Sequence, residues 1–582
     1  MWTRRQLLGS AAALCGFFAT RRVWAKAPLR FLAVPPSSDD AVLVPSGYRA
    51  ELLLGWGDPI GLGRGAKTAL DRQAPTPELQ AITSGMGHDG LEVFALPGQP
   101  DRLLVGLNHE FAELRTLYPG RDAKTPFTER EVTLGLLAQG VSIFEISRRQ
   151  GRWSVVPSRR ARRITGLTPM ELTGPAAGSS ALVTSADPLG RRVLGTFANC
   201  ATGKTPWGTL LTCEENVDDY FHRVAPDARG QRYGLRERDV YPWHQAHARF
   251  DGRLEPNEPH RFGWVVEIAP FDPDSTPKKR TALGRFKHET ATVRRDPDGS
   301  IALYMGDDEA FEHLYKFVVR DRFDPNDKKT QPDLLDHGTL YVARFDAGGR
   351  GEWLPLVHRS LDPKSPLGPE AGFADQAEVL VFARLAATAL GATPLDRPEW
   401  IALDPTTLEV YAALTNNAAR GMDGVPGVDH ANPTPHNVTG HILRWRDENA
   451  RATRFTWDIA VLAGPSPSGE AIERGDGFLC PDALRFGADG RLWIGTDAPG
   501  AVRQLNGLGH NALLCADLGT REVRRFLTAP RGAEVSGIMP TDDGTTLFVS
   551  IQHPSGAWPD GPESPPRSAL IAITREDGGR IA

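Results

Sequence analysis

The feature that most constrains the fold is a hairpin pattern that recurs along the chain. Each copy contains an apolar segment, a tight turn rich in Asp, Gly or Pro, and a second apolar segment that ends in polar residues. Five copies start with an acidic residue: Asp89, Glu289, Glu399, Asp482 and Glu534. Residues 203–216 end in the same way and are interpreted as a sixth copy. Two apolar segments joined by such a turn predict a β-hairpin.

Six hairpins spread over about 550 residues predict an all-β fold, a six-bladed β-propeller with long loop and short helical insertions. The 60 Gly and 47 Pro residues agree with many short strands joined by turns. We expect a single catalytic propeller domain over residues 40–582, with insertions at about 217–261 and 355–395. The first insertion is predicted to be a polar surface excursion. The second contains the one predicted helix, at 375–390, with a capping box formed by Asp375 and Glu378.

The acidic residues at the hairpin starts indicate a metal site. In a propeller the innermost strands line a central channel, so equivalent positions of the six hairpins converge on one axis. A ring of carboxylates there would repel itself unless cations neutralised it. The alternative is that each acid accepts backbone N–H bonds within its own blade.

A thiol and two carboxylates follow the apolar run in residues 203–216. Cys213 and Glu215 share one face of the strand and Glu214 takes the other, because side chains alternate along a strand. Carboxylates suit Ca²⁺ or Fe³⁺, whereas a thiolate favours a redox metal or zinc. The alternative is a buried structural cysteine followed by a solvated acidic turn.

An arginine, Arg397, lies two residues before Glu399, on the same side of an extended chain. A guanidinium bonds two oxygens of a phosphoryl group at once. Bound metals together with such an arginine indicate hydrolysis of a phosphate ester. An ion pair with a neighbouring acid is the alternative for Arg397.

The first 25 residues have the pattern of an export signal. A basic pair, Arg4 and Arg5, precedes an apolar stretch and a small-x-small exit, and the pattern is that of a twin-arginine signal. We therefore expect the twin-arginine export machinery as a partner and a periplasmic or secreted mature chain from about Lys26. No later stretch is long and apolar enough to span a bilayer.

Charge and cysteine content narrow the function further. A net charge of −5 suggests no nucleic-acid partner, and nothing requires more than a monomer. The cysteines beyond the leader form no C-x-x-C pair, so neither a disulfide framework nor a zinc cage is predicted. A disulfide between Cys200 and Cys213, or one between Cys480 and Cys515, is the alternative that the sequence leaves.

Motifs along most of the chain resemble the PhoX-type alkaline phosphatases, from about residue 40 to the C-terminus. They lie at residues 108–110, 199–216, 263–267, 285–289, 304–309, 397–399 and 552–554. The resemblance implies a six-bladed propeller that hydrolyses phosphate monoesters, in some members diesters too. It also implies a cofactor of two Fe³⁺ and several Ca²⁺ with a bridging oxo group.

Carried onto this chain, the resemblance implies the following site. Arg397 would hold the phosphate, together with Asn199. The implied metal ligands are Cys213, Glu289 and Glu399, with Glu214 and Asp482 beside them and Asp308, Glu309 and Asp497 as further candidates.

The leading interpretation is an exported metal-dependent phosphatase, acting on small phosphate esters for phosphate acquisition. One alternative is a calcium-stabilised propeller of the same family with another hydrolase activity, such as a lactonase. Another is a non-catalytic binding role. Either Cys213→Ala or Glu399→Gln is expected to abolish hydrolysis and leave the protein folded.

Overall fold

The computed structural model describes residues 29–62, 68–122, 124–222, 227–236, 240–326, 331–464 and 474–582. The leader and the expected mature start at Lys26 lie outside these residues. The described chain is mostly β-sheet, as predicted, and its strands form five sheets. Each of the six predicted hairpins is present.

Two sheets come from the first half of the chain. The first has the order β2 (His88–Leu96), β3 (Gln99–His109), β4 (Gly140–Arg149) and β5 (Arg152–Val156), and β6 (Arg162–Ile164) also pairs with β4. The second has the order β9 (Asn199–Lys204), β10 (Leu210–Glu214), β11 (Val265–Ile268), β12 (Lys278–Arg280), β7 (Pro169–Thr173) and β8 (Arg192–Leu194).

The largest sheet has nine strands and contains two hairpins, one at each end. Its order is β13 (His288–Arg295), β14 (Ile301–Asp307), β15 (Leu314–Val319), β16 (Gly338–Asp346), β17 (Arg350–Pro355), β21 (Arg454–Leu462), β20 (His441–Asp447), β19 (Val410–Leu414) and β18 (Pro398–Leu403). The pairing of β17 with β21 joins two groups of strands that follow one another in the chain.

The last two sheets contain the C-terminal strands together with the first strand of the chain. One has the order β23 (Pro481–Phe486), β24 (Leu492–Thr496), β25 (Ala512–Asp517), β26 (Glu522–Thr528) and β22 (Arg474–Gly475). The other has the order β27 (Glu534–Pro540), β28 (Thr546–Gln552), β29 (Ala569–Arg575) and β1 (Tyr48–Gly55). The N-terminal strand β1 thus pairs with the C-terminal strand β29, which ties the two ends of the described chain together.

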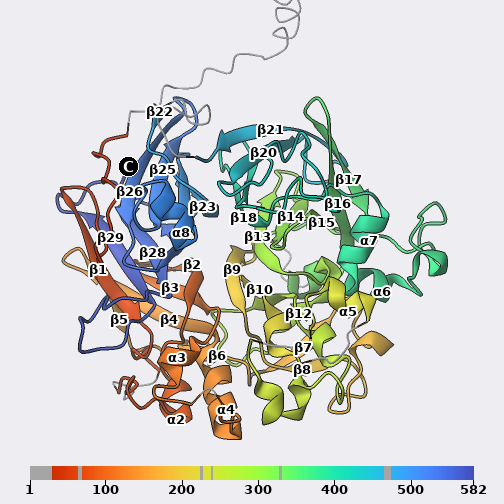
Figure 1. Ribbon diagram of the computed structural model, residues 1–582, viewed down its shortest axis with the longest axis horizontal. Helices are drawn as coiled ribbons and strands as arrows, with labels where there is room; N and C mark the ends of the chain where they lie inside the picture. Colours follow the sequence, from red (N-terminus) through yellow and green to blue (C-terminus); the bar gives the residue numbers. More distant parts are fainter. Residues whose placement is uncertain are drawn as a thin grey trace, which may run out of the picture.

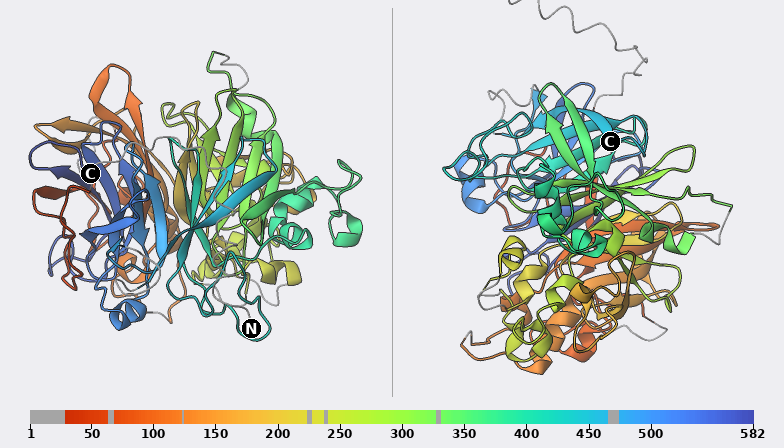
Figure 2. Two further views of the ribbon diagram at one scale, coloured as in Figure 1. Left: turned by 90° about the horizontal axis from the view of Figure 1, so that it is seen from above. Right: turned by 90° about the vertical axis from the view of Figure 1, so that its right-hand side faces the viewer.

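The first strands of the six hairpins form a closed ring. Contacts run from β2 to β9, β13, β18, β23 and β27, and from β27 back to β2. Figure 1 shows β9, β13, β18 and β23 around the middle of the molecule, with the later strands of each sheet further out. Figure 2 shows the same molecule from two further sides, from above and from the right-hand side of Figure 1, with the sheets seen side by side.

Every one of these six hairpins carries a β-bulge near its start. The register shifts lie between His88 and Leu91, Thr212 and Glu214, Glu289 and Thr292, Pro398 and Ile401, Pro481 and Leu484, and Ser536 and Met539. Residues with a positive φ lie in or next to these places: Gly87, Ala198, Thr290, Arg397, Cys480 and Gly537. Because a bulge re-aims the side chains beside it, these irregularities set the direction of the residues at the hairpin starts.

The helices lie outside the ring. The predicted helix at 375–390 is present but is split at Phe382 into α6 (Gln376–Val381) and α7 (Ala383–Ala389), at the outer edge of the molecule in Figure 1. Asp375 caps it by accepting from the backbone nitrogen of Glu378. Other short helices are α2 (Pro77–Gln80), α3 (Leu114–Leu117), α5 (Ala228–Arg232) and α8 (Gly500–Leu505).

The prediction of a single helix is wrong, because α4 (Glu129–Ala138) is longer than either α6 or α7. A capping box of Thr128 and Glu131 starts it. Its C-terminal half is buried almost all round, so it shows no alternation between a polar and an apolar face.

The insertion at 217–261 also differs from the prediction of a polar surface excursion. Its aromatic residues are buried, and Tyr220 and Tyr241 stack with ring centroids 4.4 Å apart. Trp243 packs against both rings. The segment is polar in composition, but its aromatic side chains supply enough apolar area to hold it against the fold.

The structure also bears on membrane-spanning helices and on the disulfides that the sequence leaves as alternatives. Within the described ranges, no helix has both the length and the apolar character to cross a bilayer. The four cysteines of these ranges, Cys200, Cys213, Cys480 and Cys515, are buried and form no disulfide with one another, so neither of the two bridges left open by the sequence is present.

Candidate metal centre

Carboxylates from different hairpins gather at one end of the ring. Asp89, Glu289, Glu399 and Asp482 each occupy the second position of an innermost strand, and they are at most 8% exposed. Glu534 begins β27, and its side chain is 12% exposed. The convergence that the repeat pattern predicts for these acids is therefore present in the structure.

A second set of polar residues lies directly after the second strands of the hairpins. The set comprises Glu110, Glu215, Asp308, Asp497 and His553, which follow β3, β10, β14, β24 and β28. The first and last residues of an antiparallel hairpin lie opposite one another, so this set joins the first at the same end of the ring.

Burial and mutual repulsion raise the pKa of the central carboxyl groups. Burial, followed by the charges of Glu215 and Glu399, raises the pKa of Glu289 well above its ordinary value. Burial, followed by the charges of Asp497 and Asp308, raises the pKa of Asp482 in the same way. A group of acids this dense can stay ionised only if positive charge is added to it.

A thiol belongs to this cluster. The ligand atoms of Cys200, Glu215 and Glu289 lie within 4.8 Å of one another, and all three residues are buried. The oxygen Oε2 of Glu289 has no hydrogen-bond partner within the described residues. Burial, followed by the charges of Glu289 and Glu215, raises the pKa of the Cys200 thiol. One sulfur and several carboxylate oxygens around an unsatisfied buried acceptor form a donor set that fits a transition metal such as iron.

A second possible metal-binding group adjoins the first. Ligand atoms of Asp497, Glu534 and His553 also lie within 4.8 Å of one another, and these residues are half-buried. The ring nitrogen Nε2 of His553 is 3.4 Å from Oε2 of Glu534. Glu110 lies close to this group, because Gln552 donates a hydrogen bond of 2.8 Å to its carboxylate. Oxygen-rich sites of this kind suit a hard cation.

The guanidinium of Arg397 is bound between two of the acids. Its Nη2 lies 2.6 Å from Oδ2 of Asp308 and 2.9 Å from Oε1 of Glu399. Burial raises the pKa of the Asp308 carboxyl, but the charge and the hydrogen bond of Arg397 lower it more. The pKa of Asp308 is therefore below its ordinary value. The Arg397 side chain remains 34% exposed, so a molecule from solvent can reach it. The ion pair that the sequence left as an alternative for Arg397 is therefore present, while part of the side chain stays exposed.

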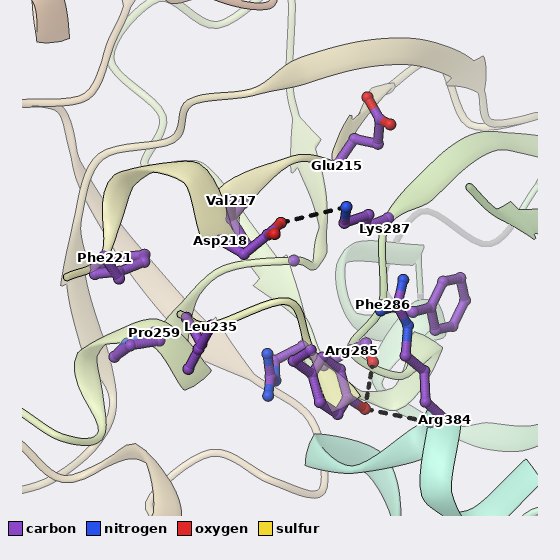
Figure 3. A pocket seen from close by; sticks show the side chains of 12 residues that line it. Glu215, Val217, Asp218, Phe221, Leu235, Pro259, Arg285, Phe286, Lys287 and Arg384 are labelled. Carbon is purple, nitrogen blue, oxygen red and sulfur yellow. Dashed lines mark hydrogen bonds and ion pairs between the residues drawn. The ribbon is translucent and has the colours of Figure 1, made fainter. Parts of the chain in front are cut away.

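A basic residue beside the cluster, Lys287, is shown in Figure 3. Lys287 lies 3.4 Å from Asp218 and 3.0 Å from Glu309, and it borders a small cavity together with Glu215. The cavity measures about 10 Å³, room for about one water molecule. Its size excludes a phosphate ester.

Two predicted site residues, Asn199 and Cys213, lie on the paired strands β9 and β10. Cys213 packs in the hydrophobic core, and within the described residues its sulfur is not part of either metal-binding group. Asn199 donates from its amide nitrogen to Thr196 and Thr212, at 2.8 and 3.0 Å, while its Oδ1 is buried and has no hydrogen-bond partner among the described residues.

Two predicted acidic ligands are satisfied by other partners. Glu214 is fully buried and lies 2.6 Å from Nζ of Lys279, and its other oxygen accepts from the backbone nitrogens of Gly263 and Trp264. Glu309 pairs with Lys287, and its side chain is 44% exposed.

The sequence motifs do not identify Cys200 or Glu110 as site residues. They place Glu215 in the segment interpreted as part of a metal centre, but the ligand set implied by the family resemblance leaves it out. A signal for Cys200 was present in the repeat. When the sixth hairpin is started at Asn199, where β9 begins, Cys200 takes the second position of the strand. Asp89, Glu289, Glu399 and Asp482 occupy the same position in their own strands.

Comparison with known proteins agrees with this geometry. A family model described as alkaline phosphatase PhoX matches residues 29–555. A solved structure of Pseudomonas fluorescens PhoX in complex with vanadate, a transition state analogue, is 44% identical. The alignment covers 95% of this chain and 99% of that chain, with a TM-score of 0.90.

Other comparisons add nothing to the function. A Dyadobacter fermentans protein of unknown function is 8% identical, with 91% of this chain and 100% of that chain covered and a TM-score of 0.37. No curated protein matches. On the strength of the family model and the 44% identical structure, each matched over most of the chain, this protein belongs to the PhoX alkaline phosphatase family and is a phosphatase that hydrolyses phosphate esters.

Proposed function

We propose that this phosphatase acts on phosphate monoesters and that Arg397 binds the phosphoryl group at a mixed iron and calcium centre. The observation that carries the proposal is the accessible guanidinium of Arg397, held by Asp308 and Glu399 at the edge of the acidic cluster. The vanadate bound to the related Pseudomonas fluorescens enzyme supports a phosphoryl-binding site in this fold.

We infer a six-bladed β-propeller as the architecture, in a single domain over residues 40–582. Support comes from the six bulged hairpins and from the ring of contacts among their first strands. In this interpretation the nine-stranded sheet is two blades joined at their outer edges, and β1 completes the last blade.

The donor sets favour two kinds of metal. Cys200, Glu215 and Glu289 would hold iron, because they combine a thiol with buried carboxylates. The remaining acids of the cluster would hold calcium. Two Fe³⁺, several Ca²⁺ and a bridging oxo group remain the composition that we propose. When bound, such cations polarise a phosphoryl oxygen and lower the pKa of bound water.

The residues of the chain contribute binding and orientation. Arg397 can donate two parallel hydrogen bonds to phosphoryl oxygens. Asp308 and Glu399 restrict its guanidinium to one place before substrate arrives, which lowers the entropy lost on binding. Because both carboxylates are themselves buried, they retain their position when the substrate exchanges with water.

We also propose export by the twin-arginine route, a mature chain from about Lys26, and a monomeric enzyme in the periplasm or medium. The support is the Arg4-Arg5 pair, the apolar stretch and the small-x-small exit of the leader. Phosphate acquisition is the role that suits such a location.

The test combines metal analysis of the natively exported protein with hydrolysis of 4-nitrophenyl phosphate. We expect iron together with calcium, and we expect Arg397→Ala to lower kcat/KM by about 100-fold, as for loss of an oxyanion-binding donor. Glu399→Gln should also abolish turnover. Arg280→Lys is the matched control, because Arg280 is a buried arginine paired with Glu267 outside the cluster. Calcium without iron, or full activity of Arg397→Ala, would contradict the proposal.

A further inference from the structure

The backbone that carries Arg397 has an unfavourable conformation. Arg397 has a φ of 53°, in the left-handed region that residues with a Cβ rarely adopt. It lies between Asp396 and Pro398, the first residue of β18. Such a conformation persists only where the surrounding structure holds it.

Asp396 is bound by a different partner at each of its two oxygens. The Nε of Arg420 donates to Oδ1 at 2.7 Å, and the amide of Asn437 donates to Oδ2 at 3.0 Å. Asp396, Arg420 and Asn437 are all 0% exposed. Both oxygens of the carboxylate next to Arg397 in the sequence are therefore hydrogen-bonded to buried partners.

Arg420 also contacts the two chain segments that meet at the ion pair of Arg397. Its Nη2 donates to the backbone oxygen of Pro394 at 2.9 Å, upstream of Arg397. Its guanidinium lies over the ring of Phe311, 4.9 Å from the centroid, in the loop that follows Asp308. The backbone nitrogen of Phe311 in turn donates to the oxygen of Leu395 at 2.8 Å.

Asn437 links Asp396 to the loop of residues 418–436, which begins after Asn417 and ends before Asn437. Its Oδ1 accepts from the backbone nitrogen of Gly440 at 2.8 Å, and its backbone oxygen accepts from Asn417 at 2.6 Å. The backbone nitrogen of Thr415 donates to the oxygen of Arg397. Both ends of the 418–436 loop are thus anchored beside Arg397.

We propose that Asp396, Arg420 and Asn437 form a positioning triad that sets the place of the Arg397 guanidinium and thereby the affinity for the phosphoryl group. A buried charged pair such as Asp396 and Arg420 contributes little net stability compared with apolar packing. We therefore look for its role in the position that it gives to Arg397. The triad connects the backbone before Arg397 with the loop after Asp308. The side chains of Arg397 and Asp308 form the 2.6 Å ion pair described above. The proposal rests on the proposed role of Arg397 in phosphate binding.

The first variant is Asp396→Asn in the metal-loaded enzyme. It keeps the shape of the side chain but places an amide against the amide of Asn437, so one hydrogen bond is lost. We expect kcat/KM for 4-nitrophenyl phosphate to fall, and the inhibition constant of vanadate to rise, each by about 10-fold, since small displacements of a binding group have such effects. Iron and calcium content should not change.

A charge relocation provides the rescue. Combining Asp396→Asn with Asn437→Asp restores an amide–carboxylate pair with donor and acceptor exchanged, and it should recover part of the vanadate affinity. Arg420→Lys, which keeps a buried cation without the fork, is the second variant if Asp396→Asn does not fold. A purely structural triad would lower Tm in these variants without changing the vanadate inhibition constant, and that result would overturn the proposal.

A double-mutant cycle separates the triad from the role of Arg397. In the Arg397→Ala background, Asp396→Asn should have no further effect on kcat/KM, because nothing remains to be positioned. If the two effects instead multiply, the triad acts independently of Arg397 and the proposal is wrong. If Arg397→Ala alone retains full activity, the proposed phosphate-binding role has failed and the triad fails with it. Arg280→Lys serves again as the control with unchanged kinetics.

Discussion

Two cysteines on paired strands have different surroundings, although both lie near acids. Both pack in the same hydrophobic core cluster, but only Cys200, in β9, places its sulfur in the group with Glu215 and Glu289. Among the described residues, the sulfur of Cys213, in β10, belongs to neither metal-binding group. The sequence motifs favour Cys213 as the ligand, and the geometry favours Cys200. Paired substitutions decide between the two.

We predict that Cys200→Ala loses iron and hydrolysis while the protein stays folded. Cys213→Ala should keep both and lower the free energy of unfolding by about 1 kcal/mol, the usual effect of a small cavity. Metal analysis by mass spectrometry and hydrolysis of 4-nitrophenyl phosphate measure the outcome. Loss of iron in Cys213→Ala, with full activity in Cys200→Ala, would return the assignment to Cys213.

Glu214 differs from its neighbour Glu215 because it points into a separate polar site. Burial raises the pKa of Glu214 and lowers the pKa of Lys279 to about 8, so each of these groups depends on the other for its charge. We predict that Glu214→Gln lowers the free energy of unfolding by about 3 kcal/mol, because it leaves the Lys279 charge buried without a counter-charge. Metal content of the purified folded protein should be unchanged, and a selective loss of one metal would instead identify Glu214 as a ligand.

The element that positions the acids is the bulged hairpin. At each bulge the register shifts, and residues with positive φ lie beside the acids. Gly537, in the bulge of β27, has a φ of 52°, and a Cβ there would overlap the backbone oxygen of Asp89 on β2. Close approach of two hairpins thus depends on a glycine.

We predict that Gly537→Ala lowers both stability and activity, because β27 must move away from β2 and Asp89. Gly98→Ala is the matched control: Gly98 has a φ of 71°, and no atom of the described residues lies within 4 Å of the place that a Cβ would take. The control should lower the free energy of unfolding by about 1 kcal/mol, the effect of left-handed backbone alone, with unchanged kcat/KM. Thermal unfolding and hydrolysis assays test this, and equal effects of the two variants would exclude the steric explanation.

At the scale of the whole molecule, the closed ring concentrates negative charge in its centre. Burial and neighbouring acids raise the pKa of Asp89, Glu215 and Glu534 well above their ordinary values. The carboxyl groups of the unfolded chain, with a pKa of about 4, lose their protons at lower pH than these folded groups. The folded, cation-free protein therefore binds more protons than the unfolded chain.

We predict that the chelated protein loses stability as pH rises from about 5 to about 8, because unfolding then releases bound protons. The metal-loaded protein should lack this loss, since cations replace the protons. Tm measured across this range with and without chelator tests the prediction, and addition of Ca²⁺ and iron should restore Tm at high pH. A chelated protein with a Tm independent of pH would show that the acids need no cations.

The hairpins could be predicted from the sequence, because alternating apolar segments and turn residues act within about ten residues. The family and most of the acids at the hairpin starts could be predicted too, since these acids recur at one position of each copy. The helix α4 could not, because its buried surroundings remove the polar face, and neither could the burial of the aromatic residues in 217–261.

Which polar residues meet depends on the tertiary structure. Glu214 and Glu215 are adjacent in the sequence, yet one pairs with Lys279 and the other joins the cluster. Cys200 and Cys213 lie on paired strands, yet among the described residues only the sulfur of Cys200 joins the cluster. The physical reason is that bulges and left-handed residues change the direction of side chains locally, while the partners come from strands far apart in the chain. Neither the direction of a side chain at a bulge nor the identity of its distant partners is encoded in a local pattern.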